Sequence, residues 1–122
     1  MAMNLTIPGI LTVNGSDYAE RFPVKEVIPK NRFVTLNGES IKLANKSDSY
    51  ILGVTADKPG VIGDMEVSGI EVGLLGKLWV DHDGTAKVNG YVKCGDNGIA
   101  TASETGYRVM AVVGEKCRIL VK

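Results

Sequence analysis

The clearest structural signal in the sequence is Val34-Thr35-Leu36-Asn37-Gly38-Glu39-Ser40-Ile41-Lys42-Leu43. Two short runs of mostly apolar and β-branched residues, Val34–Leu36 and Ser40–Leu43, flank Asn37-Gly38. Asn-Gly between such runs is the strongest short-range signal for a β-hairpin, because both residues accept the positive φ of a tight hairpin turn. The stretch therefore predicts two antiparallel strands joined by a tight turn.

The same pattern recurs along the chain, punctuated by 15 glycines. Further strands are expected at Tyr50–Ala56, Leu78–Val80, Thr85–Val88, Tyr91–Cys94, Tyr107–Val113 and Cys117–Val121, with turns at Lys58-Pro59-Gly60, Asp83-Gly84, Gly95–Gly98 and Gly114-Glu115. No window longer than ten residues keeps an apolar period of 3.6, so helices should be scarce. The one expected helical turn is Asp17–Arg21. We predict an all-β domain whose short hairpins form a barrel or sandwich.

Composition limits the classes of function. A chain of 122 residues is one domain in length, and its 14 cationic and 14 anionic side chains balance. No global charge attracts it to nucleic acid or to anionic lipid, and no apolar run approaches the roughly 20 residues needed to span a bilayer. Met1–Asn4 lacks the basic start of a secretory signal. We therefore expect no nucleic-acid or membrane partner, and assembly in a cytoplasm.

Few residues could carry metal or thiol chemistry. Cys94 and Cys117 are read as two small, half-buried thiols in neighbouring strands. His82 lies in Asp81-His82-Asp83-Gly84 and is read as a solvated turn residue, since a triad histidine would need a nucleophile that the sequence does not reveal. One histidine and two distant cysteines do not make a metal site, so we expect neither metal nor resident cofactor.

The first thirteen residues differ from the rest. Leu5–Val13 loosely alternates apolar with small or polar side chains and is interrupted by Pro8-Gly9, and proline cannot donate to a central ladder. An exposed apolar arm of this kind needs a cover, for which a partner chain is the natural candidate. We divide the chain into an arm or fibre-end strand, 1–13, and a β domain, 14–122. The alternative is an ordinary first strand of the domain.

Asp17 and Glu20 form the one acidic constellation of interest. Three residues apart on a helical turn, they would share a face. Two close carboxyl groups split their pKa values, so one can act as base and the other as acid in peptide hydrolysis. The same spacing also fits a capping box, with Asp17 as N-cap and Glu20 at N3. Spacing leaves both interpretations open.

Several motifs, in order, resemble a known family. They are Gly15-Ser16-Asp17-Tyr18-Ala19-Glu20-Arg21-Phe22, Phe33–Gly38, Ile41–Ala44, Tyr50–Val54, Pro59–Gly63, Val72–Leu78, Asp83–Thr85, Val88–Tyr91 and Gly98–Val109. They are similar to the autoproteolytic intramolecular-chaperone domain, of the glutamic peptidase class, at the carboxyl end of phage pre-neck appendage and tail-fibre proteins. The resemblance covers nearly the whole chain.

This resemblance implies a role and a site. Family members help an upstream fibre or appendage segment to trimerise and fold in register, and are then released by self-cleavage just before the acidic motif. Asp17 and Glu20 would be the catalytic carboxyl groups, and the cut would fall at Val13-Asn14 or Asn14-Gly15. The chain would accordingly be a virion component, assembled as a homotrimer in the host cytoplasm.

Two departures from the family pattern bear on cleavage. The long insertion that usually follows Pro59–Gly63 is reduced to Asp64–Glu71, and Val13-Asn14 replaces the serine and basic residue associated with the cut. We therefore expect a trimerisation and chaperone module that stays uncleaved. The alternatives are an active self-cleaving domain and a free-standing virion decoration or adaptor protein.

Overall fold

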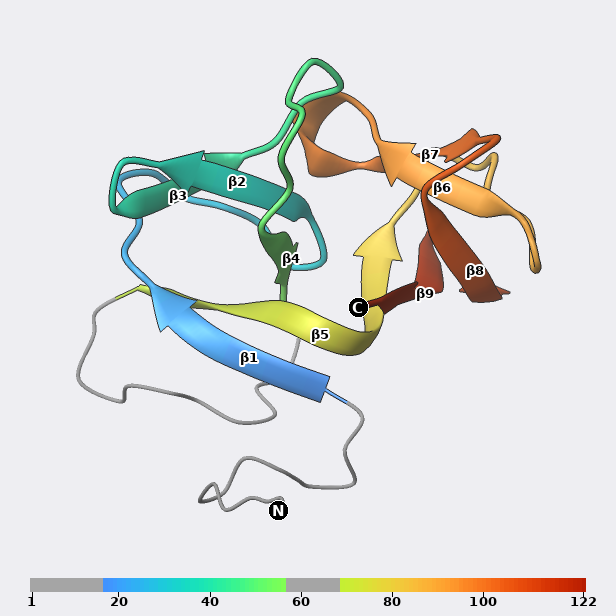
Figure 1. The fold of residues 1–122 in the computed structure, drawn as a ribbon, viewed down its shortest axis with the longest axis horizontal. Helices are drawn as coiled ribbons and strands as arrows, with labels where there is room; N and C mark the ends of the chain where they lie inside the picture. The colour runs from blue at the N-terminus through green and yellow to red at the C-terminus, as the bar shows by residue number, and fades with distance from the viewer. Residues whose placement is uncertain (1–16, 57–68) are drawn as a thin grey trace.

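The computed structural model describes residues 17–56 and 69–122, so the proposed arm 1–13 and the proposed cleavage position at Val13, Asn14 and Gly15 lie outside the described residues. The described part confirms an all-β domain (Figure 1). Its elements are β1 Asp17–Phe22, β2 Phe33–Asn37, β3 Ser40–Leu43, β4 Gly53–Thr55, β5 Ile70–Asp81, β6 Tyr91–Cys94, the 3₁₀ turn η1 Asp96–Gly98, β7 Ala100–Ser103, β8 Tyr107–Val113 and β9 Lys116–Val121.

The strands form one antiparallel sheet in the order β3-β2-β4-β5-β9-β8-β6-β7, with β1 paired to β5 off this path. The sheet curls into a half-barrel, within the predicted class of barrel or sandwich (Figure 1). Strand β5 organises it. At Gly73 it pairs with Ala19 of β1 on one edge and with Val54 of β4 on the other, and from Gly76 to Asp81 it pairs with β9. One long strand thus joins the two halves of the domain.

The hairpins with two-residue loops are confirmed. Asn37 pairs with Ser40, so Gly38-Glu39 is the loop between β2 and β3, one residue later than the Asn-Gly signal suggested. Val113 pairs with Lys116 around Gly114-Glu115 in the same way. Both glycines have positive φ, +69° at Gly38 and +60° at Gly114, as the first residue of a tight hairpin loop requires. The β6–β7 hairpin around Gly95–Gly98 is confirmed as well.

The hairpin predicted around Asp83-Gly84 is wrong. Thr85–Val88 forms no strand, because this segment is bonded to β7 instead of turning back along β5. The N–H of Asp83 donates to the carbonyl of Ala100 (3.0 Å), and the N–H of Ala102 donates to Oγ1 of Thr85 (2.9 Å). Leu78–Val80 of β5, the first arm of the predicted hairpin, pairs with β9 instead.

The helical turn predicted at Asp17–Arg21 is also wrong, since these residues belong to strand β1. Pairing with β5 overrides the local capping signal, and Ala19 is 3% exposed. The strand expected at Tyr50–Ala56 is shorter than predicted. It is limited to β4, Gly53–Thr55, and Tyr50 is 85% exposed.

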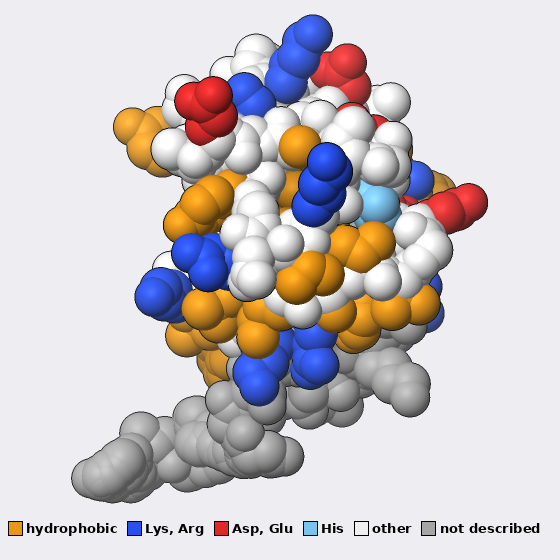
Figure 2. All heavy atoms as spheres, turned by 90° about the vertical axis from the view of Figure 1, so that its right-hand side faces the viewer, with side chains coloured by type: hydrophobic (Ala, Val, Ile, Leu, Met, Phe, Trp, Pro, Cys, Tyr) orange, Lys and Arg blue, Asp and Glu red, His pale blue; other side chains and the backbone are white. Residues whose placement is uncertain are grey.

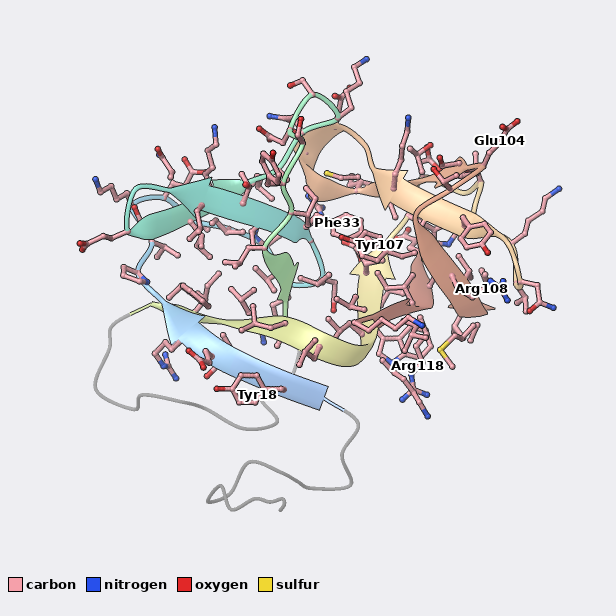
Figure 3. All side chains as sticks on the ribbon, in the orientation of Figure 1. Tyr18, Phe33, Glu104, Tyr107, Arg108 and Arg118 are labelled. Atoms are coloured by element: carbon pink, nitrogen blue, oxygen red, sulfur yellow. The ribbon has the colours of Figure 1, made fainter. Side chains whose placement is uncertain are left out.

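Buried apolar residues form two clusters. The larger contains Phe33, Ala44, Val54, Leu78, Val80, Ala86, Val92, Cys94, Ala100, Val109, Cys117 and Ile119, and the smaller contains Ile28, Val34, Ile41 and Val72. The rings of Phe33 and Tyr107 stack with centroids 5.4 Å apart and so join β2 to β8 (Figure 3). Both cysteines are buried and unbonded to each other. They are not in neighbouring strands, because β8 lies between β6 and β9.

Candidate functional site

Strand β1 places Glu20 beside a phenol. Successive side chains of a strand alternate between its faces, so Tyr18 and Glu20 share one face and Ala19 points to the other, where it is buried. Both Tyr18 and Glu20 are half-buried. The hydroxyl of Tyr18 donates a hydrogen bond to Oε2 of Glu20 (Tyr18 is labelled in Figure 3). The geometry of β1 therefore joins a carboxylate to a neutral donor.

The contact with Glu20 raises the pKa of Tyr18. The pKa of Tyr18 is raised from 10.0 to about 12, first because its proton is held in the hydrogen bond to Glu20, then by burial, and then by the charge of Glu20. A phenol with this pKa stays protonated through the physiological range. Tyr18 is thus a permanent hydrogen-bond donor to Glu20.

A β-bulge lies opposite this pair. Tyr18 pairs with Leu75 and Ala19 with Gly73, which leaves Leu74 of β5 as an extra residue. Bulges bend a strand, increase its twist and often redirect side chains next to functional sites. The bulge therefore distorts the ladder at the point where β1 carries Tyr18 and Glu20.

Arg21 fixes β1 to β5 by separate contacts. Its Nη2 lies 2.7 Å from Oε2 of Glu71, the residue opposite it in the ladder, and its Nη1 donates to the carbonyl of Gly69 (3.0 Å). Both side chains are about one-fifth exposed, 23% for Arg21 and 18% for Glu71. The cation next to Glu20 in sequence is thus bound to a different carboxylate.

The structure describes the predicted site residues in part. Glu20 is described completely and Asp17 by its backbone alone, whereas Val13, Asn14 and Gly15 lie outside the described residues. The helical face that would have paired Asp17 with Glu20 is absent, because the backbone is extended. Sequence reasoning missed Tyr18, and the spacing of two between Tyr18 and Glu20 would have revealed it once β1 was read as a strand.

His82 is held by backbone groups. Its Nε2 lies 2.9 Å from the carbonyl oxygen of Gly114, and the N–H of Gly84 donates to its Nδ1 (3.1 Å). These two contacts connect the turn after β5 to the β8–β9 loop. Within 17–56 and 69–122 there is no group of three or more His, Cys, Asp or Glu side chains suited to a metal ion. In the same ranges, no helix has the length and apolarity of a membrane span.

The fold and site define a curled antiparallel β domain whose first strand carries an acidic residue held by a phenol. Residues 2–71 match the family model of the Peptidase_G2, IMC autoproteolytic cleavage domain. The chain belongs to this family, as the sequence motifs predicted.

Two solved structures share the fold. The crystal structure of the bacteriophage phi29 gene product 12 C-terminal fragment superposes with a TM-score of 0.69 at 20% identity, over 87% of this chain and 100% of that one. The pre-mature bacteriophage phi29 gene product 12 gives a TM-score of 0.70 at 20% identity, over 88% of this chain and 21% of that one. No curated protein matches the sequence.

Proposed function

We propose that this chain is the intramolecular-chaperone module of a phage or prophage appendage or tail-fibre protein. Membership in the IMC autoproteolytic cleavage family carries the proposal, and the fold shared with the complete C-terminal fragment of the phi29 protein supports it. In this proposal the domain follows a fibre or appendage segment, keeps its chains in register while they fold in the host cytoplasm, and contributes to the virion.

We propose further that the module acts as a homotrimer. Among the described residues, β1 has one strand neighbour, β5, which leaves its other backbone edge for pairing with a second chain. Figure 2 shows hydrophobic side chains gathered between cationic ones on the face over β6–β9, and Met110 and Val113 of β8 are 41% and 64% exposed. Closed cyclic symmetry would cover such surfaces without leaving an open end.

Self-cleavage is a second candidate function. It is favoured because the residues that match the family model include the candidate carboxyl groups and the candidate bonds. Residues 2–71 include both Asp17 and Glu20 and the bonds at Val13-Asn14-Gly15. The ion pairs Arg21–Glu71 and Arg32–Asp81 do not use Glu20. The carboxylate of Glu20 is therefore held without being neutralised by either of these cations.

The reaction would be a hydrolysis. One carboxylate takes a proton from water, whose oxygen adds to the carbonyl carbon of Val13 or Asn14. The other carboxyl group donates its proton to the leaving nitrogen as the C–N bond breaks, which gives a new carboxylate and a new amine. Glu20 lies five positions after Gly15, roughly 16 Å along an extended chain. The chain must therefore turn back, and Gly15 has the backbone freedom for this turn.

Native mass at several concentrations, combined with denatured intact mass of fresh and aged protein, tests both functions. The assembly module predicts a trimer, whereas a strict monomer at high micromolar concentration would contradict it and favour a free-standing decoration or adaptor protein. Self-cleavage predicts release of a 13- or 14-residue peptide. If the protein is a trimer and its denatured intact mass does not change with age, the assembly function stands and self-cleavage is excluded.

Asn14-Gly15 requires its own control, because an Asn-Gly bond can break slowly through a succinimide without any carboxylate. Glu20→Gln and Asn14→Ala are therefore incubated side by side. Carboxylate catalysis predicts that Glu20→Gln retains its full mass. Release that persists in Glu20→Gln and stops in Asn14→Ala would instead identify succinimide chemistry.

A further inference from the structure

The hydrogen bond from Tyr18 restrains the carboxylate of Glu20. A glutamate side chain has three rotatable torsions, and its carboxylate can present either oxygen in several directions. The phenol of Tyr18 binds Oε2 from two residues away on the same face of β1. A tyrosine has two side-chain torsions and a rigid ring, so its hydroxyl is a well-placed anchor for the carboxylate.

We propose that Tyr18 is the positioning residue of the self-cleavage reaction: its hydroxyl holds Oε2 of Glu20 so that Oε1 is presented to the attacking water or the leaving nitrogen. The inference rests on the proposed self-cleavage and adds to it a residue outside the acidic pair. Tyr18 itself exchanges no proton in the reaction. Its pKa, raised to about 12 beside Glu20, keeps the phenol protonated and able to donate at neutral pH.

Two features of the structure separate this role from a purely structural one. The Arg21–Glu71 ion pair and the hydrogen bond from Arg21 to Gly69 join β1 to β5 without involving Tyr18. The bulge at Leu74 lies opposite Tyr18 and Ala19, so the ladder between β1 and β5 is irregular beside Tyr18. Tyr18→Phe keeps the ring and removes the donor, so β1 should remain in the sheet.

The experiment measures two quantities on the full chain. The first is the rate of peptide release, by intact mass, for the wild type, Tyr18→Phe, Glu20→Gln and Tyr50→Phe. Tyr50 is the matched control because it is a highly exposed tyrosine outside β1. The second is the alkaline titration of tyrosinate absorbance, in which the wild type minus Tyr18→Phe difference isolates one of four tyrosines.

The proposal predicts that Tyr18→Phe cleaves on the order of ten- to a hundredfold more slowly, as expected for a misplaced catalytic group. Tyr50→Phe should stay within about twofold of the wild type, since it alters an exposed side chain away from the site. The difference titration should show Tyr18 ionising near pH 12, and Glu20→Ala should move this transition toward 10.0. The titration tests the contact between Tyr18 and Glu20, and the cleavage rates test its role in the reaction.

The experiment distinguishes failure of the positioning role from failure of self-cleavage. If the wild type and Tyr18→Phe release the peptide at the same rate while Glu20→Gln is inactive, the positioning role is wrong and self-cleavage stands. If the wild type releases nothing, self-cleavage is wrong and the positioning role falls with it. If Tyr18 titrates near 10.0 in the wild type, the contact itself is contradicted.

Discussion

Gly53 of β4 and Gly73 of β5 approach so closely that a Cβ on Gly53 would lie 2.1 Å from the carbonyl oxygen of Gly73. The same added carbon would lie 2.9 Å from Cγ1 of Val72, a fully buried side chain. Gly73 also pairs with Ala19, so β1, β5 and β4 lie side by side at this level. A glycine at position 53 is therefore required for three strands to pack together.

Gly53→Ala should destabilise the domain by about 1–3 kcal/mol, the usual cost of overpacking a filled core. Chemical unfolding measures this change in the free energy of unfolding. Glu39→Ala, in the exposed β2–β3 loop, is the control and should change stability by no more than about 0.5 kcal/mol. Equal stability of the two variants would contradict the close approach.

The glycines also show what could be predicted from the sequence. Gly38 and Gly114 open two-residue loops, and such loops are determined by local backbone preferences, so both hairpins were predictable. Gly73 and Gly76 instead lie inside β5, where Gly73 pairs with both β1 and β4 and Gly76 pairs with both β1 and β9. The residues adjacent in sequence do not show whether a glycine opens a turn or lies inside a strand.

The geometry around the candidate residues could not be predicted from the sequence. The motif singles out Asp17 and Glu20 as candidates, but their local spacing suggested a helix, whereas the structure has a strand. The pairing partner that makes Asp17–Phe22 a strand lies about fifty residues away, in Ile70–Gly76. For the same reason the alternation that joins Tyr18 to Glu20 could not be seen before β1 was known to be extended.

The buried hydroxyl group of Thr55 should contribute to the stability of the domain. It is 2% exposed, and its Oγ1 accepts a hydrogen bond from the N–H of Arg32 (3.0 Å) and donates one to the carbonyl of Pro29 (2.7 Å). Thr55→Val keeps the volume but leaves both backbone groups without this partner, at a cost of about 1–3 kcal/mol. Thermal unfolding against Thr105→Val, an exposed threonine, measures it. A loss no greater than in Thr105→Val would contradict the role of this hydroxyl.

The two thiols should be inert in the folded protein. Burial, followed by nearby carboxylates, raises the pKa of both Cys94 and Cys117 from 9.0 to about 11. Because the thiolate is the reactive form, alkylation at pH 8 should be slow until denaturant exposes these residues. Intact mass after timed alkylation, with and without urea, measures the rates. Rapid labelling without urea would contradict the burial.

The same thiols predict how stability depends on pH. Their folded pKa values lie above the unfolded ones, so the folded state holds these protons more tightly. This contribution is complete below pH 9 and is lost as the pH rises toward 11. Cys94→Ala and Cys117→Ala should each lose less stability than the wild type between these two pH values, as measured by unfolding at each pH.

Deleting residues 1–13 should weaken association more than it affects folding. Every member of the two buried clusters lies at or beyond Phe22, and β1 begins at Asp17, so the truncated chain retains the whole described core. The arm proposed for 1–13 would instead contact neighbouring copies. Native mass should show fewer trimers at a given concentration, while the cooperative thermal transition persists.

A substitution in β1 distinguishes the effect of the strand on stability from the effect of the arm on association. Arg21→Met removes the ion pair with Glu71 and loosens β1 inside each copy, so it should lower thermal stability. The truncation should not, because it leaves that pair in place. If the truncated chain instead loses its cooperative transition, residues 1–13 belong to the core of the domain. If it unfolds normally and still forms trimers at the same concentration, association uses the edge of β1 that has no partner among the described strands, or the face over β6–β9, in place of the arm.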